Sequence, residues 1–277
     1  MSYVEIPLWR LAIAVLLVVV AIFLSRSSRL ELEKDLGIGA VRAAVQLIAI
    51  GYGLRLLFAA EHPVAVFAVL TVMWIVAGWT SSRRAKHAPP ARVLFPYALA
   101  AIGVGAFVAL VPVFVLIMPP KPWFEARYVI PIGGMMLSSA MNVVAQVFER
   151  LFASARAEAG TLEQYLALGA TPEQALAPYV KAALRAALIP TINGLITVGL
   201  VSLPGMMTGQ ILSGTSPEQA VRYQLVVMYQ LVAVAAVAGA VASSFARRLI
   251  FTREAQLRPI TEEPERTGNG RPGRPRP

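Results

Sequence analysis

The sequence predicts an all-α membrane protein whose helices form a polytopic bundle of about seven spans. Hydrophobic residues make up 57% of the 277-residue chain and charged residues only 14%, whereas soluble domains carry roughly 25% charged residues. The apolar residues form long runs, each near the ~20 residues that a helix needs to cross a bilayer. Basic residues punctuate these runs instead of forming one patch, which argues against nucleic-acid binding despite a net charge of +10.

Each apolar run is expected to be a helix, because a bilayer offers no partner for free backbone N–H and C=O groups. The first run is interpreted as a retained helix, since no small-residue cleavage site follows it. Pro204 and Gly205 interrupt the sixth run. The predicted spans are Leu8–Leu24, Ile38–Phe58, Val64–Thr80, Leu94–Met118, Tyr128–Val147, Leu188–Leu212 and Tyr223–Ala246.

The distribution of Lys and Arg predicts the N-terminus outside and the C-terminus inside, because cytoplasmic loops retain basic residues. In this orientation the outer loops hold only Lys121, Arg127 and Arg222. The inner loops hold Arg26, Arg29, Lys34, Arg83, Arg84, Lys86, Arg92, Arg150, Arg156, Lys181 and Arg185. The chain is therefore expected in a cell membrane, inner or plasma, as a multi-pass protein.

Two parts are predicted. Residues 1–252 form the transmembrane domain and include a long cytoplasmic loop at about 149–187. Residues 253–277 are rich in Pro, Gly and Arg with little to bury, so they are predicted to be a disordered basic cytoplasmic tail. A solvated tail is favoured over one bound to anionic lipid.

The long cytoplasmic loop carries the signals of two capped helices joined by a tight turn. Thr161 is suited to cap a first helix, and Gly169 to end it in a left-handed conformation. Thr171, Pro172 and Gln174 together predict a capping box that starts a second helix. Such a rigid helix pair is suited to bind a motor protein. A helix that lies on the lipid headgroups explains the same capping signals equally well.

The turn sequence recurs later in the chain. G-A-T-P-E-Q-A at Gly169–Ala175 is echoed by G-T-S-P-E-Q-A at Gly214–Ala220. The predicted topology puts the two segments on opposite faces of the membrane. Shared capping chemistry is therefore favoured over an internal repeat.

Polar side chains inside the spans are candidates for a substrate path, since they are costly in hydrocarbon. Arg42 and Gln46 share one face of a helix at i, i+4, and Asn142 and Gln146 repeat the spacing. Gln224 lies near the outer end of the last span. Snorkelling and pairing between helices are the alternatives, and we favour these for the first pair.

Six of the methionines lie near the same segments, at Met135, Met136, Met141, Met206, Met207 and Met228. Packing is favoured over metal contact for them, because thioether sulfur suits Cu(I) better than Fe(II). Oxygens of the Pro204–Gln210 break are the more suitable partners for ferrous iron. The chain has no cysteine, no G-x-x-x-x-G-K-[ST] loop and no nucleophile–base arrangement, so it is not expected to be an enzyme.

Five segments carry a resemblance to a known family: R-A-A-V-Q-L at Arg42–Leu47, I-P-I-G-G-M at Ile130–Met135, A-A-L-I-P-T-I-N at Ala186–Asn193, the run Gly199–Gly214 and A-V-R-Y-Q at Ala220–Gln224. They resemble the FetB family of ABC permeases, which includes a bacterial protein implicated in iron export and is related to plant permeases linked to aluminium tolerance. Glu163 followed by Gly169 also resembles the E-A-A-x-x-x-G signature of ABC importer permeases. Ser138 and Ser139 replace the Gly-Asn pair expected in the FetB family, so no role for that pair is carried over.

The resemblance implies a permease subunit without a bound cofactor, which exports metal ions, with iron the best guess. A homodimer is expected, and a separate cytoplasmic ATPase would use ATP and dock at Glu163, Gly169, Ala170, Thr171 and Pro172. Another substrate such as a nucleotide sugar, or a motor-free channel or carrier, remains the alternative. The candidate path residues are Pro204, Gly205, Met206, Met207, Gln210, Gln224, Arg42, Gln46 and Asn142.

Overall fold

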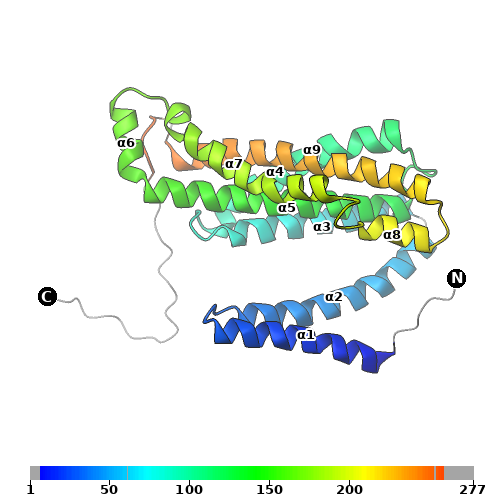
Figure 1. Ribbon diagram of the computed structural model, residues 1–277. Helices are drawn as coiled ribbons and strands as arrows, with labels where there is room; N and C mark the ends of the chain where they lie inside the picture. The colour runs from blue at the N-terminus through cyan, green and yellow to red at the C-terminus, as the bar shows by residue number, and fades with distance from the viewer. Residues whose placement is uncertain (1–6, 61, 253, 259–277) are drawn as a thin grey trace. The chain divides into compact units, whose positions relative to one another are not determined.

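The computed structural model describes residues 7–60, 62–252 and 254–258 and confirms the all-α fold. Within those ranges the regular elements are helices, and pairing of β type is limited to two isolated bridges. The helices are α1 (Leu8–Ser27), α2 (Glu33–Ala60), α3 (Pro63–Arg84), α4 (Ala91–Pro112), a π-helical turn (Val113–Ile117), α5 (Ala126–Ala157), α6 (Ala159–Ala167), α7 (Pro172–Thr197), α8 (Gly205–Leu212) and α9 (Pro217–Ile250) (Figure 1).

The chain divides into two compact units, Met1–Ala65 and Val66–Pro277. The first unit is a hairpin of α1 and α2. Ser25, at the end of α1, is buried, and its hydroxyl accepts a hydrogen bond from the Leu32 amide at 3.2 Å. It also donates to Glu33 at 3.3 Å, so this one side chain closes the turn between the two helices.

Among the described residues, six helical segments are long and apolar enough to cross a membrane: Glu33–Gly53, Pro63–Arg84, Ala91–Ile117, Ala126–Ala157, Pro172–Thr197 and Pro217–Ile250. A shorter apolar stretch, Ile13–Ser27, lies in α1, where the first span is predicted. These segments bear out the expectation of a multi-pass membrane protein. The orientation of the chain stays a prediction.

The predicted sixth span, Leu188–Leu212, is wrong in its extent. The helix that contains its first half is α7, which begins far earlier at Pro172 and ends at Thr197. An irregular segment follows, and the second half of the predicted span becomes the separate short helix α8. Apolar residues continue through the irregular segment, so hydropathy alone does not reveal that the helix has ended.

Small residues let the central helices of the second unit approach closely. A Cβ atom added to Gly105 of α4 would lie 2.8 Å from the Cβ of Ala238 on α9. One added to Gly133 of α5 would lie 2.7 Å from the Leu70 side chain of α3. Close backbone approach through small residues is a common way to join membrane helices. Helices α3, α4, α5 and α9 are therefore packed around one core.

Only the beginning of the predicted tail 253–277 can be compared with the structure. Residues 254–258 turn back on the end of α9, where Leu257 bridges to Phe251. The Arg258 amide also donates to the Ile250 carbonyl at 2.9 Å. Residues 253 and 259–277 lie outside the described residues, so the prediction of a disordered tail stays a prediction.

Candidate functional site

The turn between α6 and α7 has the two-part cap that its sequence predicts. Gly169 has φ +89°, the left-handed conformation expected of it. Its amide donates to the Leu166 carbonyl and the Ala170 amide donates to the Tyr165 carbonyl, both at 3.0 Å. These two bonds form a Schellman motif, which satisfies the last carbonyl groups of α6. The turn is therefore fixed by its own backbone.

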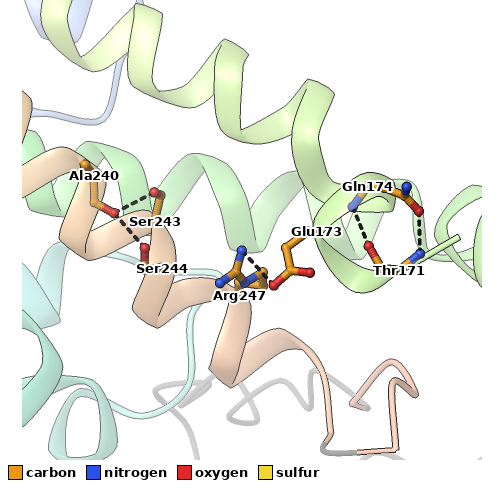
Figure 2. A network of polar contacts seen from close by, with 7 residues as sticks. All are labelled: Thr171, Glu173, Gln174, Ala240, Ser243, Ser244 and Arg247. Atoms are coloured by element: carbon orange, nitrogen blue, oxygen red, sulfur yellow. Dashed lines mark hydrogen bonds and ion pairs between the residues drawn. The ribbon is translucent and has the colours of Figure 1, made fainter.

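The start of α7 completes the turn with the predicted capping box. The Gln174 amide donates to the Thr171 hydroxyl at 3.2 Å, and the Thr171 amide donates to the Gln174 side-chain oxygen at 2.9 Å (Figure 2). Pro172 occupies the first helical position, where its missing N–H costs nothing. Thr171, Pro172 and Gln174 thus cap α7 as predicted.

The first helix of the predicted pair starts in a different place. Thr161 is not its cap, because α6 begins at Ala159 and the Thr161 hydroxyl donates to the Glu158 carboxylate at 3.0 Å. The second helix is not a separate short one, since α7 continues for 26 residues from Pro172 to Thr197. In Figure 1, α6 lies across the ends of α5 and α7.

One apolar residue anchors α6, and two others project from it. Leu162 is fully buried among the core residues. Leu168, next to the glycine turn, is 85% exposed, and Tyr165 is 45% exposed. Glu163 is also exposed. The element therefore presents an apolar and acidic surface that no described residue of its own chain covers.

The echoed sequence adopts the same turn at the other end of the bundle. Gly214 has φ +102°, and its amide and the Thr215 amide donate to the carbonyls of Ile211 and Gln210, each at 3.0 Å. The Ser216 hydroxyl then accepts from the Gln219 amide at 3.4 Å to begin α9. Figure 1 shows α8 and this turn at the end of the second unit opposite α6. Shared capping chemistry accounts for the echo, as expected.

The break after α7 is centred on Gly199 and not on Gly205. Gly199 has φ +83°, and its amide donates to the Ser202 carbonyl at 2.9 Å. Gly205 does not have a positive φ and is the first residue of α8, with Pro204 as the N-cap. The prediction that these two residues break a helix is therefore corrected: they begin one. Met206 and Met207 follow in its first turn and are half-buried.

Three glutamines in this half of the chain have buried side-chain oxygens without a hydrogen-bond partner in the part of the chain that the structure describes. Two of them, Gln210 on α8 and Gln224 on α9, are predicted path residues. The third, Gln230 on α9, is missing from the prediction, and its amide nitrogen donates to the Ala109 carbonyl at 3.2 Å. A buried unpaired carbonyl costs about 1–3 kcal/mol. Such a group is suited to accept a hydrogen bond from a water or a polar ligand, or to contact a cation.

The other predicted path residues lie on other helices. Arg42 and Gln46 lie exposed on α2 in the first unit. Asn142 lies exposed on α5 and accepts a hydrogen bond from Arg84 of α3 at 3.1 Å. Arg84 is a functional candidate that sequence reasoning counts only as a loop cation. The hydrogen-bonded pair of Arg84 and Asn142 makes one exposed side of α5 polar near its middle.

A cavity of about 580 Å³ lies where α9 begins and the segment after α4 ends. Its walls include two cations, Lys121 and Arg222, and two stacked rings, Tyr128 and Tyr223, whose centroids are 6.3 Å apart. Gln219, of the second capped turn, also lines it. The predicted topology puts this cavity on the outer side.

The methionines divide between core and periphery. Met136 and Met228 are buried among apolar neighbours, as packing requires, and Met135 and Met141 are half-buried against the same core. Within the described residues, no cluster of three His, Asp or Glu side chains has the spacing of a metal site. His87 instead contacts the Glu149 carboxylate through its Nδ1 at 2.6 Å.

Comparison with known proteins places the chain in a family. Residues 8–251 match the Uncharacterised protein family (UPF0014). The chain is 39% identical over 249 residues to the Probable iron export permease protein FetB of Escherichia coli (strain K12), covering 89% of this chain and 93% of that one. It is 36% identical over 248 residues to the UPF0014 membrane protein YjkA of Bacillus subtilis (strain 168), covering 90% and 97%.

A plant relative has a similar extent. The chain is 35% identical over 246 residues to Protein ALUMINUM SENSITIVE 3 of Arabidopsis thaliana, covering 89% of this chain and 88% of the relative. No solved structure matches the chain. Because the family match spans nearly all the helices and each of these relatives is matched over most of its length, the chain belongs to the UPF0014 family of multi-pass membrane proteins.

Proposed function

We propose that this chain is the membrane-spanning subunit of an ABC-type transporter and works with a separate cytoplasmic ATPase. The observation that carries the proposal is the exposed element formed by α6, the Gly169 turn and the capped start of α7. This element is rigid, projects apolar surface, and leads directly into a helix long enough to cross the bilayer. A motor that moves the element would therefore move α7 with it.

The docking surface is proposed to be the exposed side of α6. Leu168 and Tyr165 offer the apolar contact, and Glu163 offers a charge for a basic partner residue. Buried Leu162 holds the helix to the bundle from the opposite side. The Schellman turn at Gly169 keeps Leu168 at the tip, since the turn depends on local backbone bonds.

The substrate path is proposed to run past the unpaired glutamine oxygens. Gln210 and Gln224 each keep a buried acceptor without a partner among the described residues, which is unfavourable in a purely structural helix pair. A hydrated cation or its water shell would satisfy these oxygens during passage. The irregular segment between Thr197 and the start of α8 adds backbone carbonyl groups next to the helix that carries Gln210. Membrane transporters use unwound backbone of this kind at binding sites.

Metal ions, with iron the best candidate, are the proposed substrate, and export is the proposed direction. Both rest on the similarity to the relative named as a probable iron export permease. Two copies of the chain are proposed to form the complete membrane part, since an ABC transporter needs two membrane halves. A nucleotide sugar is the second candidate substrate.

The test is ATPase activity of the reconstituted complex of this chain with an ABC ATPase subunit. Activity should rise with Fe(II) and not with Cu(I), Zn(II) or UDP-glucose. Leu168→Asp should abolish co-purification of the two subunits, whereas Leu200→Asp should not. Leu200 is a matched control because it is 89% exposed but lies in the break at the other end of α7. Equal co-purification of both variants would refute docking at α6, and stimulation by UDP-glucose alone would refute a metal substrate.

A further inference from the structure

A groove runs between α7 and α9 where α7 begins and α9 ends. One part of it, about 470 Å³, is lined on the α7 side by Leu176, Ala177, Val180 and Leu184. A second part, about 560 Å³, contains Arg247, Arg248, Phe251, Thr252 and Arg258. Glu173 and Arg247 line both parts, so the two are continuous. The groove thus has an apolar section and a strongly basic end.

The α9 side of the apolar section is less polar than its sequence suggests. Ser243 and Ser244 both line it, yet both hydroxyls donate to the Ala240 carbonyl of their own helix, at 2.8 and 3.1 Å (Figure 2). The one O–H donor of each serine is therefore used within α9. The groove wall offers mostly carbon to whatever lies against it.

The basic end carries more positive charge than its acidic neighbour neutralises. Arg247 pairs with Glu173 at 3.1 Å across the junction of the two parts, and Figure 2 shows the two side chains pointing toward each other. Arg258 is held by its Nε, which donates to the Phe251 carbonyl at 3.2 Å. Arg248 is exposed beside them, and Lys181 lines the apolar section. Two arginines thus remain without an acid at the end of the groove in the described part of the chain.

We propose that this groove binds an anionic glycerophospholipid. Its phosphate lies against Arg248 and Arg258, and one acyl chain lies along Ala177, Val180 and Leu184. The position fits, because the stretch Leu231–Ala246 of α9 holds no charged residue and Arg247 and Arg248 follow it, which is the pattern of a helix leaving the hydrocarbon. Basic pockets between membrane helices recognise anionic lipid headgroups in this way.

Two other occupants fit the groove less well. A second copy of this chain would have to place acidic residues opposite these arginines, and the chain is strongly basic, with 25 Lys and Arg against 15 Asp and Glu. Free phosphate would satisfy the arginines but would leave the long apolar section uncovered. An anionic lipid matches both sections, and it would link the start of α7 to the end of α9. The inference stands independently of the proposed transport function.

The test is native mass spectrometry of the detergent-solubilised full chain, titrated with phosphatidylglycerol and with phosphatidylcholine of the same acyl chains. Phosphatidylglycerol should bind more tightly. Each arginine near an anionic headgroup is worth about fivefold in affinity, so Arg248→Gln combined with Arg258→Gln should weaken phosphatidylglycerol binding about 25-fold. Phosphatidylcholine binding should hardly change in this double variant.

A second variant tests the acyl section without changing charge. Ala177→Leu fills the groove from α7 and should weaken both lipids, whereas Ala182→Leu, exposed on the same helix outside the groove, should weaken neither. Arg150→Gln on α5 is the charge control and should bind phosphatidylglycerol as tightly as the unmodified chain does. Excess inorganic phosphate should not displace the lipid.

Two results would overturn the proposal. One is unchanged phosphatidylglycerol affinity in the double arginine variant. The other is displacement of the lipid by inorganic phosphate together with normal binding to Ala177→Leu, which would make the site one for free anions. Neither result depends on transport or on the ATPase subunit, so failure here is distinct from failure of the proposed function.

Discussion

Gly169 offers the sharpest test of the proposed docking element. Its φ of +89° is a conformation that side-chain-bearing residues resist, and no heavy atom lies within 4 Å of where a Cβ would be. A substitution here therefore changes backbone preference without creating a clash. The left-handed conformation costs an ordinary residue about 1–2 kcal/mol, while asparagine tolerates it better. A β-branched residue is worse still, since its side chain restricts the backbone further.

These costs predict a graded series. In the free permease, Gly169→Val would relieve its strain by opening the turn, with loss of the two Schellman bonds that end α6. Docking must then re-form the turn, so affinity for the ATPase subunit falls by the same free energy. At about 2 kcal/mol the dissociation constant should rise about 30-fold. The affinity of Gly169→Ala for the ATPase subunit should lie between those of Gly169→Val and the unmodified chain. The affinity of Gly169→Asn should be close to that of the unmodified chain.

The assay is equilibrium binding of the ATPase subunit to permease in lipid nanodiscs, with thermal stability measured in parallel. Because the position is open, all variants should insert and melt alike. Equal affinity of the valine and asparagine variants would refute the reasoning, since it would mean that the left-handed turn is not required for binding. A large loss of melting temperature for valine would show instead that the turn supports the fold.

Other regions give independent predictions. Gly105→Ala would put a Cβ 2.8 Å from a side chain of α9 and should cost about 1–3 kcal/mol, seen as a lower melting temperature. Cysteines introduced at Ser216 and Glu173 should react with impermeant reagents from outside and from the cytoplasm respectively, and the reverse pattern would overturn the orientation. Gln210→Ala should reduce transport at unchanged expression, whereas Met207→Leu should be tolerated at under about 1.5 kcal/mol; normal transport by both would refute the proposed path.

Local signals in the sequence predict the ends of helices well and their lengths less well. Gly169 and Thr171 could be recognised because the residues that form a cap are neighbours in the chain. The break at Gly199 could not, because Leu200, Val201 and Leu203 around it are as apolar as a helix interior. The start of α7 at Pro172 is predicted, but its continuation into the sixth span is not, since its first turns are rich in polar and small residues.

The site shows the same division between local and long-range information. Gln210 and Gln224 were identified because an amide within an apolar run is visible in the sequence alone. Arg84 was not linked to Asn142, because the two lie on different helices and meet only when α3 packs on α5. Gln230 carries the same signal, an amide within an apolar run, and its unpaired oxygen is predictable in the same way.

The close glycine contacts among α3, α4, α5 and α9 also determine where the molecule should be slow to open. Amides at these contacts should exchange with deuterium only on global unfolding, because no local opening leaves such tight packing intact. A Cβ added to Gly194, Gly205 or Gly209, in contrast, would meet nothing within 4 Å, and no residue of α8 is fully buried. Within the second unit, exchange should therefore begin in α8 and the end of α7, which would make this segment the part of that unit that rearranges at the lowest cost.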